Sequence, residues 1–160
     1  MASAIKTAYG SEAQAITCTL ASLADGSARQ SAAVDNTVNE WLDALVMLQI
    51  KTGAANGSDK RIYLWAYATV DAATPVYPDA VSGADAAITM NSPTQLRLLG
   101  VIEASAASTA FIGGPWSIAQ VFGSMPEKWG IVVQNKSGAA LDATEGNHKK
   151  IYQGVYSTVG

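Results

Sequence analysis

The sequence predicts an all-β fold, an antiparallel β-sandwich of jelly-roll type. The segment 61–70 alternates at every residue between a small aliphatic side and a side that bears Tyr63, Trp65 and Tyr67. A period of two is the period of a β-strand. About eight to ten short apolar segments, separated by turn signals, have the spacing typical of all-β sandwiches. Connections of uneven length favour Greek-key crossings between two sheets, as in a jelly roll.

The N-terminal part is expected to form an arm and two short strands. Residues 1–14 are small, polar and weakly patterned, so we expect an arm that becomes ordered only against a neighbouring subunit. Residues 15–160 are expected to form a single domain, because their number suits one core. Within this domain, 15–20 and 28–34 are predicted strands joined by a turn at 24–27, where Asp-Gly is a hairpin signal.

The segment 37–50 fits two interpretations. As a helix capped by Asp35 or Asn36, it would place Trp41, Leu45 and Leu48 on one face. As a strand, it has an unbroken aliphatic side that consists of Leu42, Ala44, Val46, Leu48 and Ile50. All polar residues of 41–50 then fall on the opposite side, and the neighbouring segments are strands. We therefore favour the strand.

Loops and strands alternate through the centre of the chain. Glycine, asparagine and serine mark 52–60 as a loop, and prolines mark 71–85 as a long irregular connection. A short edge strand is expected at 87–90 and a longer strand at 95–103. The longer strand is expected to direct three apolar side chains to one face: Leu96, Leu98 and Ile102.

Four further strands are expected before the C-terminus. The first is short: it begins at Phe111, after a turn at 105–109, and is ended by Gly113-Gly114-Pro115. The others are predicted at 116–122, 128–135 and 149–158. Turns at 123–126 and 136–138 and a polar loop at 141–148 separate them.

The charged-residue content of the chain limits which partners it is expected to have. Charged residues make up only 14% of the chain, against about 25% in average proteins. This composition is easier to understand if partners or further copies cover much of the surface, because distributed charge keeps soluble proteins apart. A net charge of −3 with scattered basic residues argues against a nucleic-acid partner, which requires clustered Lys and Arg.

The single cysteine, Cys18, has no partner for an internal disulfide, and we expect it to be a buried, inert thiol. The first ten residues lack a secretory signal. No apolar run approaches the roughly 20 residues that span a bilayer. These features predict a protein that is made in a reducing cytoplasm and has no membrane partner.

No residue pattern signals an enzyme. His148 is the single histidine, and we expect it on a surface loop; a standard zinc site needs several His or Cys ligands. The acidic residues are dispersed and mostly lie near turns, where Asp caps backbone amides. The region Asp79–Asp85 is the nearest candidate for calcium, but it lacks the spacing of a calcium loop. We therefore predict no catalytic residue, no metal and no cofactor.

Three aromatic residues are the remaining lead: Tyr63, Trp65 and Tyr67. A solvated strand face rarely bears three rings in a row, so these residues are candidate interface residues. Three interpretations stay open. The rings fill the sandwich or lie under a long loop such as 71–85, they form a subunit or partner interface, or they bind a ligand such as a sugar.

Two stretches of the chain resemble small structural proteins of tailed bacteriophages. The first is LASLADGSARQSAAVDN at 20–36, followed by LDALV at 42–46. The second is WGIVVQNKSGAAL at 129–141, followed by YQGV at 152–155. The resemblance implies a virion component such as a capsid decoration protein or another head or tail protein, with a jelly-roll-like sandwich. No catalytic residues come with it.

We therefore expect a non-enzymatic virion protein that is assembled in the host cytoplasm. Its expected partners are further copies of itself, in a dimer or trimer, and other virion proteins such as the major capsid protein. The alternative is a carbohydrate-binding or host-adhesion module of a phage tail or head fibre, which rests on the aromatic residues alone.

Overall fold

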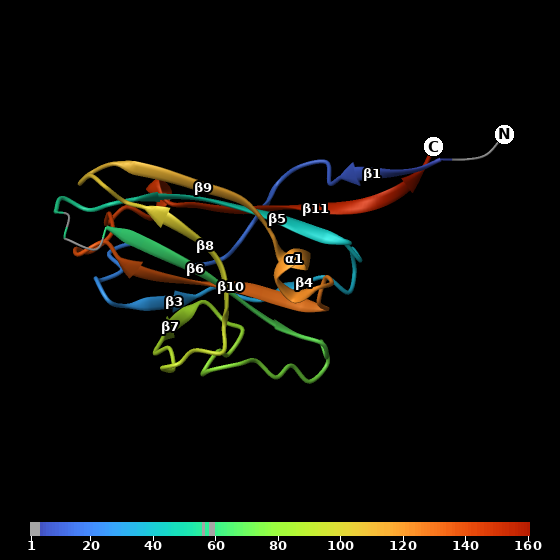
Figure 1. Cartoon of the computed structure of the whole chain (residues 1–160), viewed down its shortest axis with the longest axis horizontal. Coiled ribbons are helices and arrows are strands. Elements are labelled where there is room, and N and C mark those ends of the chain that lie inside the picture. The colour runs from blue at the N-terminus through green and yellow to red at the C-terminus, as the bar shows by residue number, and fades with distance from the viewer. Residues whose placement is uncertain (1–3, 56, 58–59) are drawn as a thin grey trace.

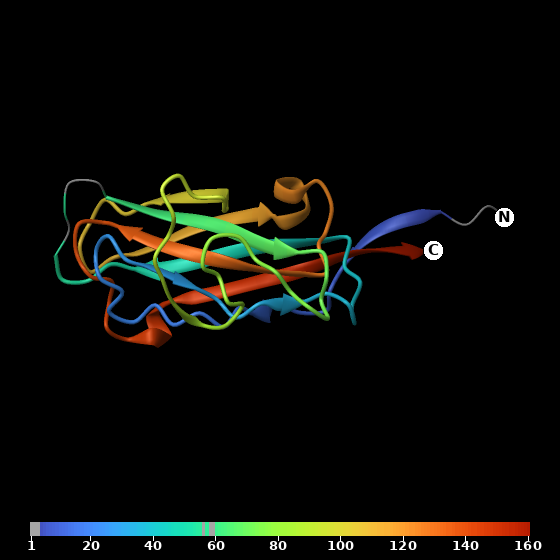
Figure 2. The same ribbon diagram turned by 90° about the horizontal axis from the view of Figure 1, so that it is seen from below.

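A computed structural model describes residues 4–55, 57 and 60–160. Two antiparallel sheets pack face to face (Figures 1 and 2), which confirms the predicted all-β sandwich. The jelly-roll topology within that class stays a prediction. Part of the loop predicted at 52–60 and the first three residues of the predicted arm lie outside the described residues.

Each sheet is built around a long strand from the C-terminal third of the chain. Sheet A has the spatial order β1 (Ile5–Tyr9), β11 (Lys149–Val159), β5 (Asp43–Lys51) and β9 (Ala110–Ser117), and β2 (Gln14–Ala15) also pairs with β11. Sheet B has the order β7 (Ala86–Ile88), β3 (Ala28–Gln30), β10 (Lys128–Lys136), β6 (Arg61–Thr69) and β8 (Arg97–Glu103), and β4 (Val34–Asp35) also pairs with β10. A short helix, α1 (Ile118–Phe122), and a 3-10 turn, η1 (Glu145–Asn147), complete the described elements.

The main core lies between the two sheets and comes from alternate residues of three long strands. These residues are each at most 1% exposed: Ala44, Val46, Leu48 and Ile50 on β5, Ile62, Leu64 and Ala66 on β6, and Trp129, Ile131 and Val133 on β10. Burial of each large aliphatic side chain contributes about 1.5–3 kcal/mol. The strand interpretation of 37–50 is therefore confirmed for 43–50, whereas 37–39 form a turn before β5.

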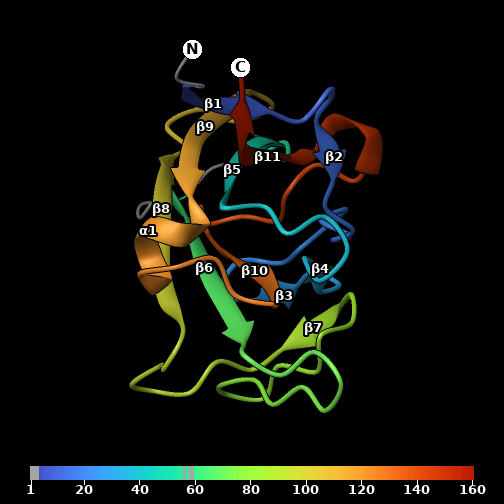
Figure 3. The same ribbon diagram turned by 90° about the vertical axis from the view of Figure 1, so that its right-hand side faces the viewer.

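A second apolar layer covers the outer face of sheet B. The connection between β6 and β8, which includes β7, runs across this face (Figure 3). It forms a separate buried cluster with members Ala28, Tyr67, Val81, Leu96 and Val132. Strand β10 is consequently buried on both faces, because the main core packs on one side and this cluster on the other.

The strand predicted at 15–20 is wrong beyond its first residue, because only Gln14–Ala15 form a strand, β2. The following backbone amides bind carboxylates from distant loops. Asp85 accepts hydrogen bonds from the Thr19 amide at 3.1 Å and from the Thr19 hydroxyl at 2.6 Å. Its Oδ1 also forms an ion pair with Arg29 at 2.6 Å. A side chain thus replaces the neighbouring strand as the partner of this backbone.

Glu145 holds the next two residues of the same segment. Its Oε2 accepts the amides of Leu20 and Ala21, each at 2.7 Å, and its Oε1 binds the ammonium group of Lys150. In the same segment, Cys18 is 3% exposed, and burial raises the pKa of its thiol to about 12. This confirms the predicted buried thiol, which stays protonated and unreactive at neutral pH.

Two sequence expectations around Gly113-Gly114-Pro115 are wrong. The glycines do not end a strand, because β9 continues through them to Ser117, with a register shift against β5 between Val46 and Leu48. Gly114 has φ +104, and an added Cβ there would lie 2.5 Å from the Val46 carbonyl oxygen. The bend therefore requires glycine at this position.

The segment predicted as a strand at 116–122 forms α1 after Ser117. The Ser117 hydroxyl accepts the Gln120 amide at 2.9 Å, and Gly123 ends the helix with φ 84. These are the ordinary cap signals of a helix. Asp43, on β5, holds the start of the helix in place, because its carboxylate accepts hydrogen bonds from the Ser117 hydroxyl at 2.7 Å and from the Ala119 amide at 2.9 Å.

A register shift in β8 reverses the expected faces of two leucines. The pairing of β6 with β8 shifts between Leu64 and Trp65. As a result, Leu99 is 8% exposed and joins the core, whereas Leu98 is 50% exposed. The strict period of two that we expected at 95–103 fails at this bulge.

The predicted arm contains a strand that pairs within its own chain. β1 pairs antiparallel with the end of β11, from Ile5 opposite Val159 to Tyr9 opposite Val155. The expectation that the arm orders only against a neighbouring subunit is therefore wrong, because the C-terminal strand supplies a backbone partner. The two strands form a ribbon that projects from one end of the sandwich (Figures 1 and 2).

We predict that acid destabilises the fold through Asp85 and Glu145. Burial alone would raise the pKa of Asp85, but its hydrogen bonds with Arg29 and Thr19 outweigh burial and lower that pKa. The pKa of Glu145 is lowered in the same way by Lys150 and two backbone amides. A lowered carboxyl pKa means that this stability is complete above the ordinary carboxyl pKa of about 4 and is lost as the pH falls below it.

Chemical denaturation across this pH range measures the effect. Asp85→Asn should reduce the free energy of unfolding at pH 7 by about 1–2 kcal/mol and flatten its decline in acid. Glu12→Gln, which changes an exposed carboxylate, is the matched control. An acid decline that is the same in wild type and Asp85→Asn would contradict this role of Asp85.

Candidate functional site

Tyr67, the third residue of the predicted aromatic row, lies in the interior. It is 0% exposed, and its hydroxyl donates a 2.7 Å hydrogen bond to the Ser31 carbonyl oxygen. Its ring meets Tyr77, from the connection between β6 and β8, edge to face at a centroid distance of 5.1 Å. Burial raises the pKa of the Tyr67 phenol well above its usual value. Tyr67 is therefore covered by its own chain.

Tyr63 and Trp65 lie on the same side of β6 but are only half-buried. Their rings stack, with centroids 6.3 Å apart and planes inclined by 26°. Trp65 also packs against the second apolar cluster, and its indole Nε1 is buried without a hydrogen-bond partner among the described residues. The interface prediction for Tyr63 and Trp65 stays a prediction.

Two exposed residues of β8 enlarge the surface around these rings. Val101 is opposite Tyr63 and is 38% exposed, while Leu98 is opposite Trp65 and is 50% exposed. Residues that are opposite each other in an antiparallel pair point to the same face. We call these four residues the aromatic patch. The sequence analysis missed Leu98 because the bulge that turns it outward has no clear signal in the pattern.

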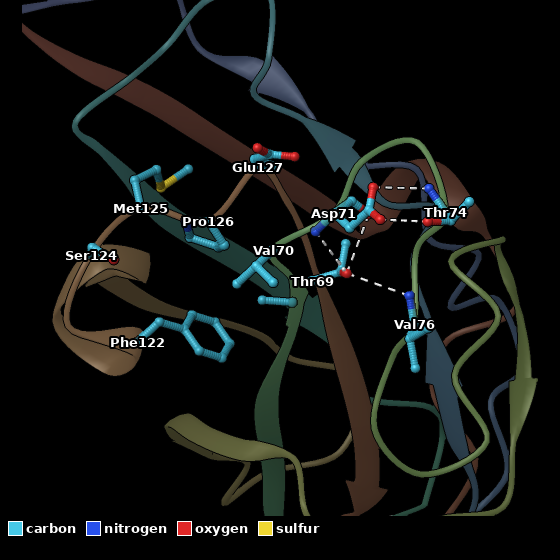
Figure 4. A pocket seen from close by; sticks show the side chains of 11 residues that line it. Thr69, Val70, Asp71, Thr74, Val76, Phe122, Ser124, Met125, Pro126 and Glu127 are labelled. Atoms are coloured by element: carbon cyan, nitrogen blue, oxygen red, sulfur yellow. Dashed lines mark hydrogen bonds between the residues drawn. The ribbon is translucent and has the colours of Figure 1, made fainter.

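A hollow of about 790 Å³ opens beside the end of β6 (Figure 4). Phe122, Met125 and Pro126 line it from α1 and the following loop. Val70 and Val76 line it from the other side and are more than 80% exposed. The sequence analysis did not identify this hollow, because it forms only where α1 replaces the expected strand.

The two carboxylates at the hollow bind the backbone of the loop that follows β6. Asp71 accepts the amides of Ala73 at 2.9 Å and Thr74 at 3.0 Å and also binds the Thr74 hydroxyl (Figure 4). The Thr74 hydroxyl, followed by these amides, lowers the pKa of Asp71. Glu127 accepts the Ala72 amide at 2.9 Å. These contacts give both carboxylates a loop-capping role, as expected for Asp near turns.

His148 is 4% exposed, so the expectation of a surface position is wrong. Its Nδ1 accepts the Lys51 amide at 3.3 Å, and its Nε2 lies 3.0 Å from the Asp142 carbonyl oxygen, to which the neutral ring donates. The ring is buried because it links β5 to the loop before β11. Both nitrogens are therefore engaged in structural hydrogen bonds.

The described residues contain no group of three or more His, Cys, Asp or Glu side chains placed to hold a metal ion. Over the same part of the chain, no helix is long and apolar enough to cross a membrane. No family model, curated protein or solved structure matches this chain. The class that the fold and surfaces define is thus an all-β sandwich with exposed apolar surface.

We predict that Tyr67→Phe destabilises the protein, whereas Tyr63→Phe does not. Removal of the Tyr67 hydroxyl leaves the buried Ser31 carbonyl oxygen without this donor, which costs about 1–2 kcal/mol. Tyr63 is half-exposed, so its substitution should change the free energy of unfolding by less than about 0.5 kcal/mol. Urea denaturation of both variants measures the difference, and equal losses would contradict the internal role of Tyr67.

Proposed function

We propose that this chain is a non-enzymatic structural protein of a tailed-phage virion, a capsid decoration protein that assembles in many copies. The observation that supports it most directly is the aromatic patch, where exposed apolar residues lie in register on neighbouring strands. Contiguous apolar surface of this kind marks interaction sites in soluble proteins. The low charged fraction of 14% supports the same function.

The pairing of the strands supports the jelly-roll form of the sandwich. Four antiparallel pairs are nested in sequence: β1 with β11, β3 with β10, β5 with β9, and β6 with β8. A long antiparallel hairpin that is wrapped into two sheets produces such nested pairs. The jelly roll is an architecture of viral capsid domains, so the nested pairing favours a virion component.

The polar groups of the chain support a structural role. Asp71 caps its own loop, and Glu127 binds the same loop from the segment before β10. Asp85 and Glu145 hold the segment that contains Cys18. Each of these carboxylates already accepts backbone hydrogen bonds. These carboxylates therefore fix the shape of the loops. A contact surface requires loops that are rigid in this way.

We assign the aromatic patch to the contact with the capsid. The patch lies on the outer side of sheet B, whereas the ribbon of β1 and β11 belongs to sheet A. One copy is thus able to contact the capsid through sheet B while the ribbon stays free for a neighbouring copy. Weak individual contacts, repeated over a symmetric particle, give strong overall attachment.

Leu98→Lys is the variant that tests this assignment. Leu98 is exposed, so the substitution spares the core, but it places an unpaired charge in the contact. We expect binding to phage particles that lack the protein to weaken at least about tenfold. Co-sedimentation of the purified protein with such particles measures the binding. Val38→Lys, at an apolar residue that is 86% exposed and lies in a turn, is the matched control.

Absence of binding by the wild type would contradict the virion function, and equal binding by Leu98→Lys and wild type would contradict the role of the patch.

A carbohydrate-binding module is the second candidate, because the stacked, half-exposed rings of Tyr63 and Trp65 offer a platform for a sugar ring. A glycan array that compares wild type with Trp65→Ala distinguishes the two. Glycan binding that Trp65→Ala abolishes would favour the second candidate.

A further inference from the structure

The terminal ribbon extends beyond the rest of sheet A. The pairing of β11 with β5 ends where Val155 lies opposite Asp43. Beyond this point, β11 continues to Val159, and its described partner is β1 alone. A two-stranded ribbon is marginally stable in water, whereas three or more strands with an apolar face are stable. The ribbon therefore has much to gain from an additional strand.

The register defines which backbone groups of β1 point away from β11. The Gly10 amide donates to the Gly154 carbonyl oxygen at 2.9 Å, and the Gly160 amide donates to that of Ala4 at 3.1 Å. Hydrogen-bonded pairs alternate along an antiparallel ladder, so even-numbered residues of β1 face β11. The amide and carbonyl groups of Ile5, Thr7 and Tyr9 consequently point to the open edge.

This edge lacks most of the usual protection against pairing. Natural edge strands are protected by proline, bulges, charges or a covering loop. Within the described residues, β1 contains no proline, pairs with β11 without a register shift, and has no second neighbour. Ile5 is 79% and Tyr9 56% exposed. Lys6 is its one charged residue, and the backbone groups of Lys6 face β11.

We propose that two copies of this chain join through β1, edge to edge and antiparallel, about a twofold axis at Thr7. In this register, Ile5 lies opposite Tyr9 of the second copy and Thr7 lies opposite its own counterpart. Aromatic–β-branched and Thr–Thr pairs are both favourable across antiparallel strands. Lys6 lies opposite Ala8, so no like charges meet. The sequence IKTAY of β1 is therefore complementary to itself.

The joined edges form a four-stranded sheet, in the order β11, β1, β1, β11, that links sheet A of both copies. Each pair formed by residues 5, 7 and 9 exchanges two backbone hydrogen bonds. A twofold contact uses the same surface on both copies and closes on itself, so it produces a dimer. This inference rests on the proposed assembly function and names the strand through which copies associate.

Thr7→Pro tests the proposal. Proline removes the Thr7 amide that points to the open edge, and edge positions whose amide faces solvent tolerate proline. Thr7→Val retains the amide and is the matched control. By analytical ultracentrifugation, we expect a reversible dimer for wild type and Thr7→Val, and dimerisation weakened at least about tenfold in Thr7→Pro, because two symmetry-related donors are lost.

Hydrogen exchange of the wild type, resolved by residue in NMR spectra, provides a test that needs no variant. The amides of Ile5, Thr7 and Tyr9, which point to the open edge, should change from fast to slow exchange as protein concentration rises, while those of Lys6 and Ala8, already bonded to β11, should change less. A wild type that is monomeric at all soluble concentrations, or a dimer that Thr7→Pro leaves intact, would overturn the proposal.

The virion function and the β1 contact fail separately. A dimer that requires the Thr7 amide but does not bind particles would overturn the virion function and leave the β1 contact in place. A protein that binds particles but shows no concentration-dependent protection at β1 would overturn the contact and leave the function in place.

Discussion

The packing of Tyr67 over Gly130 is the contact at the centre of sheet B, the sheet that both apolar layers share. The two residues are opposite each other on β6 and β10, and an added Cβ at residue 130 would lie 2.3 Å from the Tyr67 ring. Only glycine permits this approach. The Tyr67 hydroxyl then reaches Ser31, whose own hydroxyl accepts the Ile131 amide at 3.0 Å. This arrangement fixes the centre of sheet B and gives the connection between β6 and β8 a surface to cover.

The sequence was sufficient where the structure follows a local period. The strict alternation at 61–70 and the apolar residues in register at 128–135 identified β6 and β10, because each has an apolar face toward the core. The segment 16–20 alternates in a similar way, yet its amides bind Asp85 and Glu145, which lie 66 and 125 residues further along the chain. No local pattern contains that information. The helix α1 was missed although its cap residues are present, because five residues are too few to show a helical period.

The candidate site was predictable in its residue types but not in its exposure. The aromatic row marked one face of β6, but the path of the connection between β6 and β8 decides that Tyr67 is covered while Tyr63 and Trp65 reach the surface. A register shift adds Leu98 to that surface. The charged groups are instead engaged within the fold, because carboxylates such as Asp71 and Asp85 accept hydrogen bonds from loop backbone amides. We infer that the exposed apolar residues, rather than a reactive group, perform the function.

Electron cryomicroscopy of phage particles prepared with and without this chain tests the proposed assembly function most directly. We expect β-sandwich density at symmetry-related positions on the capsid, with the aromatic patch of sheet B toward the capsid and the terminal ribbons paired between copies. A map without this density, or one in which isolated copies turn the aromatic patch to solvent, would contradict a sandwich that functions through contacts with the capsid and with its own copies.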